Sequence, residues 1–155
     1  APVLVPGHIG AGAVRRHFSL RDEQVIEVGN EWGFALDLVF SRGFRALMVA
    51  GHPGKLAKLA TGQWDTHSAH SGQAVEYVRG LCRQVLDRSP PDVPTAEGLF
   101  AALESEQRRR LAGEVARRVR LAVAGRLGSR LGVAVLLVNM AGDRLGADGD
   151  FSPWQ

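Results

Sequence analysis

The chain has 155 residues, a formal net charge of +3 and a single cysteine. This length suits one domain with its own hydrophobic core, and a lone Cys82 excludes an internal disulfide, so we expect Cys82 to be an inert core residue. No run of about 18 or more apolar residues occurs, which argues against a membrane partner and favours a cytoplasmic protein.

Arginine supplies nearly all of the 19 basic residues. Its densest runs, at 108–110 and 117–120, are interrupted by Glu104, Glu106 and Glu114 at helical offsets. This spacing indicates the solvated face of a helix with ion pairs along it, so we expect no nucleic-acid partner. An arginine-rich nucleic-acid binder is the alternative, because clustered guanidinium groups also follow phosphates.

The chain alternates between short apolar runs and helical patterns. The runs at 3–5, 24–28 and 45–50 each end in a glycine-containing turn and are followed by a helical pattern. Further along, the pattern predicts helices at 71–86, 96–103 and 105–126 and a last strand at 133–138. The repetition predicts an α/β fold, a three-layer open and mainly parallel sheet of about four or five strands with helices on both faces.

The ends of these segments set the expected boundaries. Residues 1–147 are predicted to form a single α/β domain, and the acidic, glycine-rich residues 148–155 a flexible tail in which only Phe151 and Trp154 offer anchors. The first two helices are predicted at 11–18 and 34–41. The polar residues 65–68 offer a cap for the helix at 71–86.

The stretch from 45 to 68 is the most informative part of the sequence. Its strand ends at Gly51, and His52, Pro53 and Gly54 lead into a helical pattern that Lys55 opens. In an open α/β sheet, ligands bind at this end of a strand, where backbone N–H groups and the positive end of a helix meet. Lys55 is unfavourable for the helix dipole at that position, which indicates an anionic partner.

Several of these residues also have a structural interpretation. His52 is suited to holding the loop by hydrogen bonds, and Lys58 to an exposed helix face. A metal site built from His52, His67 and His70 is the other alternative, but no cysteine or carboxylate at ligand spacing supports it, so no metal is expected.

Three ordered segments carry a resemblance to a known family. They are PGHIG at 6–10, GNEWGFALDLVFSRGFRALMVA at 29–50 and GHPGKLAKLATGQWDTHS at 51–68. In this order and spacing they resemble the second domain of the CbiD family, the cobalt-precorrin-5B C1-methyltransferases. The matching residues are Pro6, Gly7, Gly10, Asn30, Gly33, Gly51, His52, Gly54, Lys55, Leu56, Lys58, Leu59, Gly62, Thr66, His67 and Ser68.

The resemblance covers essentially the whole chain, with two departures. His8 stands where the family pattern has asparagine, and AHSGQ follows Ser68 where the family has an aspartate-containing segment. Family members are about twice as long, so the family's first domain is absent from this chain.

The resemblance implies transfer of a methyl group from S-adenosylmethionine to C-1 of cobalt-precorrin-5B in anaerobic cobalamin biosynthesis, or the ligand-binding part of that enzyme. The alternative is a stand-alone, non-catalytic module or subunit that binds a corrinoid or S-adenosylmethionine. A separate N-terminal domain or subunit is an expected partner, and a homo-oligomer is compatible with the sequence.

The same resemblance assigns roles to the matching residues. Catalytic roles fall to His52, Lys55 and His67, and binding of the tetrapyrrole carboxylates to Lys55, Lys58 and His67. S-adenosylmethionine is expected over the turns, with Asn30 or Asp65 offering polar contacts. The expected cofactor-binding residues are Gly7, Gly10, Gly29, Asn30, Gly33, Gly51, Gly54, Thr66 and Ser68.

Overall fold

The computed structural model describes residues 1–67, 73–128 and 130–155. Its centre is a sheet with the strand order β2-β1-β3-β4-β5. The strands are β1 (Val3–Val5), β2 (Val25–Glu27), β3 (Ala46–Gly51), β4 (Gly132–Val138) and β5 (Arg144–Asp148). The first four pair in parallel and β5 runs antiparallel to β4. The predicted fold class, an open and mainly parallel α/β sheet, is confirmed.

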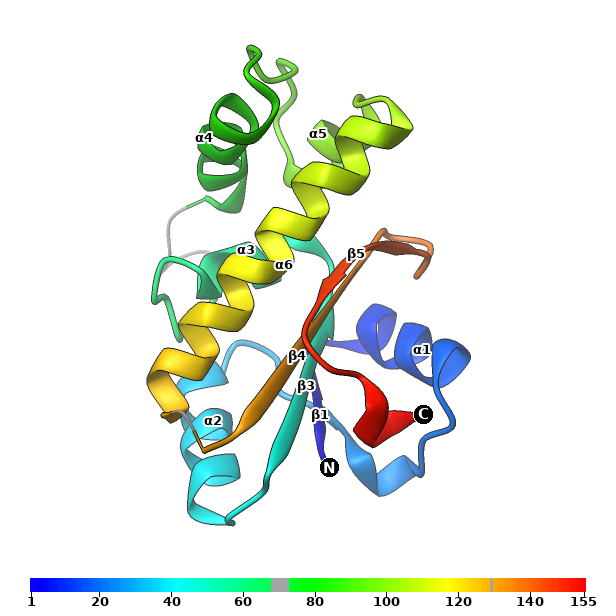
Figure 1. Ribbon diagram of the computed structural model, residues 1–155, viewed down its shortest axis with the longest axis vertical. Helices are drawn as coiled ribbons and strands as arrows, with labels where there is room; N and C mark the ends of the chain where they lie inside the picture. The colour runs from blue at the N-terminus through cyan, green and yellow to red at the C-terminus, as the bar shows by residue number, and fades with distance from the viewer. Residues whose placement is uncertain (68–72, 129) are drawn as a thin grey trace.

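The helices lie on both faces of the sheet (Figure 1). They are α1 (His8–His17), α2 (Trp32–Ser41), α3 (Pro53–Leu59), α4 (Ala74–Leu86), α5 (Ala96–Ala101) and α6 (Ser105–Leu127), with short 3-10 turns at Asp22–Gln24 and Ser152–Trp154. Helix α1 and the C-terminal turn cover one face, and α2 to α6 build the other. Among the described residues, no helix combines the length and the apolar character needed to cross a bilayer.

The apolar runs of the sequence become the buried strands. In β3, Leu47 and Val49 belong to the core beneath α2 and α6, while Met48 and Ala50 belong to the core beneath α1. Because helices cover both faces, neither set of side chains can be polar, which explains why the strand shows no alternation. Cys82 is also buried in the first of these cores, as predicted.

Two helices begin earlier than their apolar periodicity predicts. Helix α1 starts at His8, directly after Gly7, and α2 starts at Trp32. The first turn of α1 contains Ile9 and Gly10 but no repeating apolar stripe. Apolar periodicity alone therefore predicted the start of α1 three residues too late. The consequence is that the first turn of α1 lies at the carboxyl end of β1.

The polar residues 65–67 do not cap α4. That helix begins at Ala74, and its N-cap residue is Gln73. Thr66 is instead fully buried, and the other proposed cap residue, Ser68, lies outside the described residues.

The chain after β4 is more ordered than the predicted flexible tail. Residues 144–148 form β5, and Trp154 is buried with its Nε1 donating to Ala1 O at 3.2 Å. The Phe151 ring stacks on Phe18 at a centroid distance of 5.8 Å. The tail was misjudged because acidic and glycine residues suggest flexibility when the local sequence is considered alone. In the fold, Trp154 is buried in the core beneath α1, and Phe151 is partly buried against the same core.

Candidate functional site

The carboxyl ends of β1 and β3 lie side by side at the point where the strand order reverses. From β1 the chain passes through α1 to β2 on one side, and then through α2 to β3 on the other side of β1. In open α/β sheets, ligands bind in the crevice at such a switch point. Here a shallow pocket of about 180 Å³ occupies it, lined by residues 6–10 and by His52 and Lys55.

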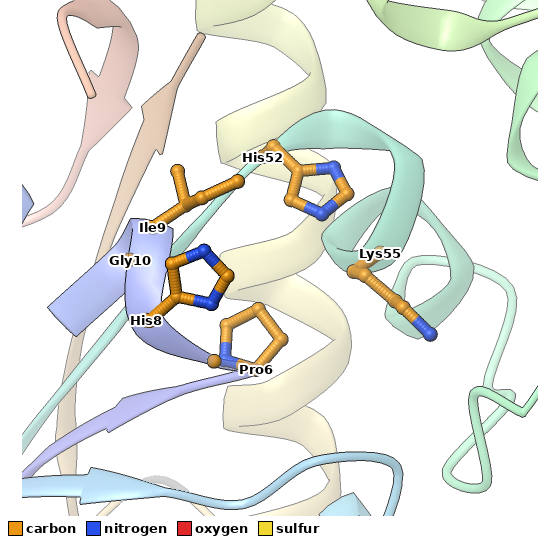
Figure 2. Close-up of a pocket in the computed structure, with 7 residues that line it drawn as sticks. Pro6, His8, Ile9, Gly10, His52 and Lys55 are labelled. Carbon is orange, nitrogen blue, oxygen red and sulfur yellow. The ribbon is translucent and has the colours of Figure 1, made fainter. Parts of the chain in front are cut away.

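Three side chains that carry nitrogen, those of His8, His52 and Lys55, line the pocket beside the first turn of α1 (Figure 2). His8 and the first turn of α1 form one wall, and His52 and Lys55 form the other. Helix α1 has no acidic residue in its first turn, and Arg15 and Arg16 lie in its last turn, as the helix dipole favours. The first N–H groups of a helix have no partner within the helix, so this wall suits an anion.

Glu97 of α5 contacts His52, one of the residues that line the pocket. Its Oε1 lies 2.6 Å from His52 Nδ1 and accepts the backbone N–H of Gly54 at 3.1 Å. The hydrogen bond from His52 holds the pKa of Glu97 below its ordinary value of 4.5, although partial burial of the carboxyl group acts in the opposite direction. An ionised carboxylate therefore already occupies the start of α3, where the sequence predicted a bound ligand.

Asn30 connects the turn after β2 with α3. Its Oδ1 accepts from Lys55 Nζ at 3.0 Å and from the buried Thr66 hydroxyl at 3.1 Å. Thr66 N also donates to Asn30 O at 3.2 Å, next to a β-bridge between Glu31 and Asp65. Lys55, expected to need an anionic partner, has this neutral amide oxygen beside it and still lines the pocket.

Lys58 is buried, in contrast to the exposed helix face that was the alternative for it. Its side chain is 8% exposed, and Nζ donates to Thr66 O at 3.1 Å. Burial, and then the nearby charge of Lys55, lower the pKa of Lys58. Lys58 lines a neighbouring pocket of about 240 Å³ together with Gly54 and Glu97. The two lysines therefore line different pockets, although their charges are close enough to interact.

The predicted cofactor-binding glycines differ in their surroundings. A Cβ at Gly51 would lie 2.8 Å from the Pro6 ring, and one at Gly10 would lie 2.9 Å from Ala50 O, so these glycines allow α1 and β3 to approach closely. Gly29 has a φ of +59° and makes the turn after β2. A Cβ at Gly7, in contrast, would meet no atom within 4 Å.

Gly33 also makes a contact within the fold, with the loop that contains Trp64. Its N–H donates to Trp64 O at 3.0 Å, and the Arg126 guanidinium lies over the Trp64 ring, 5.1 Å from the centroid. The hydrogen bond from Gly33 thus connects the segment that contains Asn30 to the loop after α3.

His67 is not among the residues that line the pocket. His67 is exposed, and its backbone N–H donates to Asp65 Oδ1 at 3.0 Å. Ser68 and His70 lie outside the described residues. Within residues 1–67, 73–128 and 130–155, no three histidine, cysteine or acidic side chains are grouped so that they could hold a metal ion.

Glu97 is the site residue that sequence reasoning missed. It is the second residue of α5, two positions after the cap residue Thr95, whose Oγ1 accepts from Gly98 N at 3.0 Å. An acidic residue there is also what the helix dipole alone favours. Only the packing of α5 beside α3 shows that its carboxylate contacts His52, 45 positions away in the sequence.

Curated proteins that are similar to the chain share one name, cobalt-precorrin-5B C(1)-methyltransferase. One from Syntrophotalea carbinolica is 53% identical over 154 residues, which cover 99% of the chain and 44% of that protein. One from Chromobacterium violaceum is 34% identical, over 94% of the chain and 42% of that protein. The chain is a homologue of part of the cobalt-precorrin-5B C1-methyltransferases.

The resemblance seen in the glycine-rich segments is thereby confirmed. It extends to an archaeal cobalt-precorrin-5B C1-methyltransferase from Methanococcus aeolicus, which is 29% identical over 94% of the chain. The chain spans less than half the length of these relatives. No family model matches it, and no solved structure gives a significant match.

Proposed function

We propose that the chain takes part in S-adenosylmethionine-dependent methylation of C-1 of cobalt-precorrin-5B, in anaerobic cobalamin biosynthesis, and that it supplies the pocket between β1 and β3. The observation that carries this proposal is the pocket lined by His8, His52 and Lys55 at the switch point of a chain that is 53% identical to a protein named for that reaction. S-adenosylmethionine, when bound, supplies a methyl group that its sulfonium already activates. The protein then has mainly to bind and align its substrates and to exclude water.

The residues around the pocket fit such ligands. Both S-adenosylmethionine and the tetrapyrrole carry carboxylates, which the first turn of α1, His8 and Lys55 are placed to bind. Gly7 leaves open space where any side chain would project, so a ligand can approach the backbone there. The Lys55 ammonium donates a hydrogen bond to Asn30 Oδ1, which helps to fix its position.

The size of the pocket supports a further element of the proposal. Ligand pockets usually enclose about 300–1,000 Å³. The pocket here has a volume of about 180 Å³, so it can enclose only part of a cofactor or of a tetrapyrrole. We propose that the remaining polypeptide of the longer relatives, as a domain or a separate subunit, completes the site.

The alternative function is a binding module that holds a corrinoid or S-adenosylmethionine without methyl transfer. The shallowness of the pocket favours it for this chain by itself, because a half-open site cannot exclude water. The two functions differ in whether methylated product forms once the rest of the polypeptide is supplied.

A methyl-transfer assay tests the proposal. Cobalt-precorrin-5B and S-adenosylmethionine are incubated with this chain, with and without the unmatched part of the Syntrophotalea carbinolica relative, and methylated product and S-adenosylhomocysteine are quantified. We expect product in the complemented reaction and a loss of at least tenfold with Lys55→Met, while Arg109→Gln, on the exposed face of α6, serves as the control. Ligand binding without product in the complemented reaction would favour the binding module instead.

A further inference from the structure

Methyl transfer to a ring carbon leaves a proton to be removed. The methyl group arrives without its bonding electron pair, so the ring system gains one positive charge when the carbon–carbon bond forms. The product regains the charge of the substrate only if a proton leaves a neighbouring N–H or C–H group. This inference rests on the proposed function, which therefore requires a proton acceptor in the pocket.

Three side chains of the pocket carry a nitrogen that could take this role. Lys55 as an ammonium has no lone pair, and its Nζ donates to Asn30. His8 is exposed, and no hydrogen bond fixes its ring to the described parts of the chain. His52 is different because its Nδ1 lies 2.6 Å from Glu97 Oε1, which fixes the ring. Its side chain is also only 20% exposed.

The contact with Glu97 also decides which ring nitrogen of His52 carries the proton. An ionised carboxylate only accepts hydrogen bonds, so the neutral imidazole must place its proton on Nδ1. Its Nε2 then has a free lone pair. In Figure 2 the edge of the ring that carries Nε2 faces the space between His8, Pro6 and Lys55.

Glu97 is held in turn by the backbone of α3. The same Oε1 atom accepts from Gly54 N, which is two residues after His52. Ring and carboxylate are thus fixed to one short segment, and neither can turn without breaking a hydrogen bond. This is the arrangement by which a carboxylate orients a histidine base and stabilises its protonated form.

We propose that Glu97 is a positioning residue, and that it holds His52 so that Nε2 accepts the proton released during methyl transfer. In this step the new carbon–carbon bond forms as the carbon–sulfur bond breaks, and the electron pair of the broken bond stays on sulfur. The proton leaving the methylated ring system passes to Nε2. The imidazolium is stabilised by Glu97 and then returns its proton to water through the open side of the pocket.

The tautomer can be tested without any methyl transfer. Nitrogen-15 NMR of the chain at about pH 8, where an ordinary imidazole is neutral, distinguishes a protonated ring nitrogen from an unprotonated one. We expect His52 in the wild type to show a protonated Nδ1 and an unprotonated Nε2. In Glu97→Leu, which removes the acceptor oxygen, we expect the other tautomer to gain population, and Glu106→Gln, on an exposed carboxylate, to leave the spectrum of His52 unchanged. A protonated Nε2 in the wild type would overturn the proposal.

The role as a proton acceptor is tested by the pH profile of the complemented reaction. Among the described residues, the charged and titratable groups that contact His52 or line the pocket with it are Glu97 on α5, Lys55 on α3 and His8 on α1. We expect Glu97→Gln to lower kcat about 100-fold with little change in KM, and to move the acid limb of the profile to lower pH, because a neutral amide no longer stabilises the imidazolium. Glu97→Asp should restore part of the rate.

The outcomes separate this inference from the proposed function. In Glu97→Gln the new side-chain amide oxygen can still accept from Gly54 N, so the variant is expected to keep the start of α3. An unchanged pH profile with a lower rate would reduce Glu97 to a structural residue and overturn the proposal. An absence of methyl transfer in the complemented wild type would overturn the proposed function and the proton-acceptor role together, while the NMR result would still decide how Glu97 orients His52.

Discussion

Lys55 Nζ donates to Asn30 Oδ1 at 3.0 Å, and this contact joins the turn after β2 to a helix that follows β3. The two strands are not neighbours, because β1 lies between them. The same oxygen accepts from the buried Thr66 hydroxyl. One amide group therefore joins three segments of the chain, namely the turn after β2, helix α3 and the segment that contains Thr66.

This contact should be measurable as a coupling energy. We expect a double-mutant cycle of Asn30→Ala and Lys55→Met, followed by urea unfolding, to give a coupling of about 0.5–1.5 kcal/mol. Asn139→Ala combined with Lys55→Met is the matched control and should be additive, because Asn139 makes its hydrogen bonds with Asp143. Additivity of the Asn30 and Lys55 variants would contradict the contact.

The close approach at Gly54 leads to a second prediction. A Cβ at this position would push the Glu97 carboxylate away from Gly54 N and His52, so we expect Gly54→Ala to destabilise the chain by about 1 kcal/mol through the lost hydrogen bonds. Gly113→Ala, within α6, is the control, since its Cβ would meet no atom within 4 Å. That variant should stabilise the chain by about 0.5–1 kcal/mol. Thermal or urea unfolding of both variants measures the difference.

The ion pairs of α6 should give stability a dependence on acid pH. Hydrogen bonds from Arg117 and Arg118 lower the pKa of Glu114 from its ordinary value of 4.5 to about 2. Because folding lowers this pKa, the stabilisation is fully present above pH 4.5 and is lost as the pH falls toward 2. The arginines are partly exposed, so we expect Glu114→Gln to cost only about 1 kcal/mol near neutral pH.

The measurement is the unfolding free energy of wild type and Glu114→Gln across this pH range. The difference between the two should shrink steadily as the pH falls. Glu106→Gln, which removes an exposed pair with Arg109, is the control and should stay within about 0.5 kcal/mol of the wild type. A difference for Glu114→Gln that did not change with pH would contradict the assignment.

The packed C-terminal segment leads to a fourth prediction. Trp154 is 2% exposed and belongs to the core beneath α1. We expect Trp154→Ala to destabilise the chain by about 3–5 kcal/mol, whereas a flexible tail would tolerate the change. Met140→Ala, at a side chain that is 54% exposed, is the control for thermal unfolding.

The sequence was sufficient to predict the four parallel strands. Strands β1, β3 and β4 are short, continuous apolar runs, which burial on both faces produces. The edge strand β2 has the same local pattern although its residues are partly exposed. Strand β5 was missed because Arg144 and Gly146 break any apolar pattern. Its glycine is explained by tertiary packing, since a Cβ at Gly146 would lie 2.7 Å from the Ala112 side chain of α6.

The sequence indicated which turns line the candidate pocket, but not the contacts made there. Glycines after β1 and β3 pointed to the sheet edge where this pocket lies, because a strand followed by a glycine turn and a helix is a local pattern. Local sequence could not show that Gly10 and Gly51 serve close packing. It also could not show that Glu97 contacts His52, because only the packing of α5 brings these two residues together.

Ligand binding at the pocket between β1 and β3 tests the central claim most directly. Titration calorimetry with S-adenosylhomocysteine compares the wild type with Gly7→Val, which adds a side chain to a residue that lines the pocket and whose extended backbone accepts valine. Gly12→Ala, at an exposed position of α1, is the control. We expect a micromolar Kd in the wild type and in Gly12→Ala, and a loss of at least tenfold in Gly7→Val. Equal affinity in all three proteins, or no binding at millimolar ligand, would contradict the assignment of the cosubstrate to this pocket.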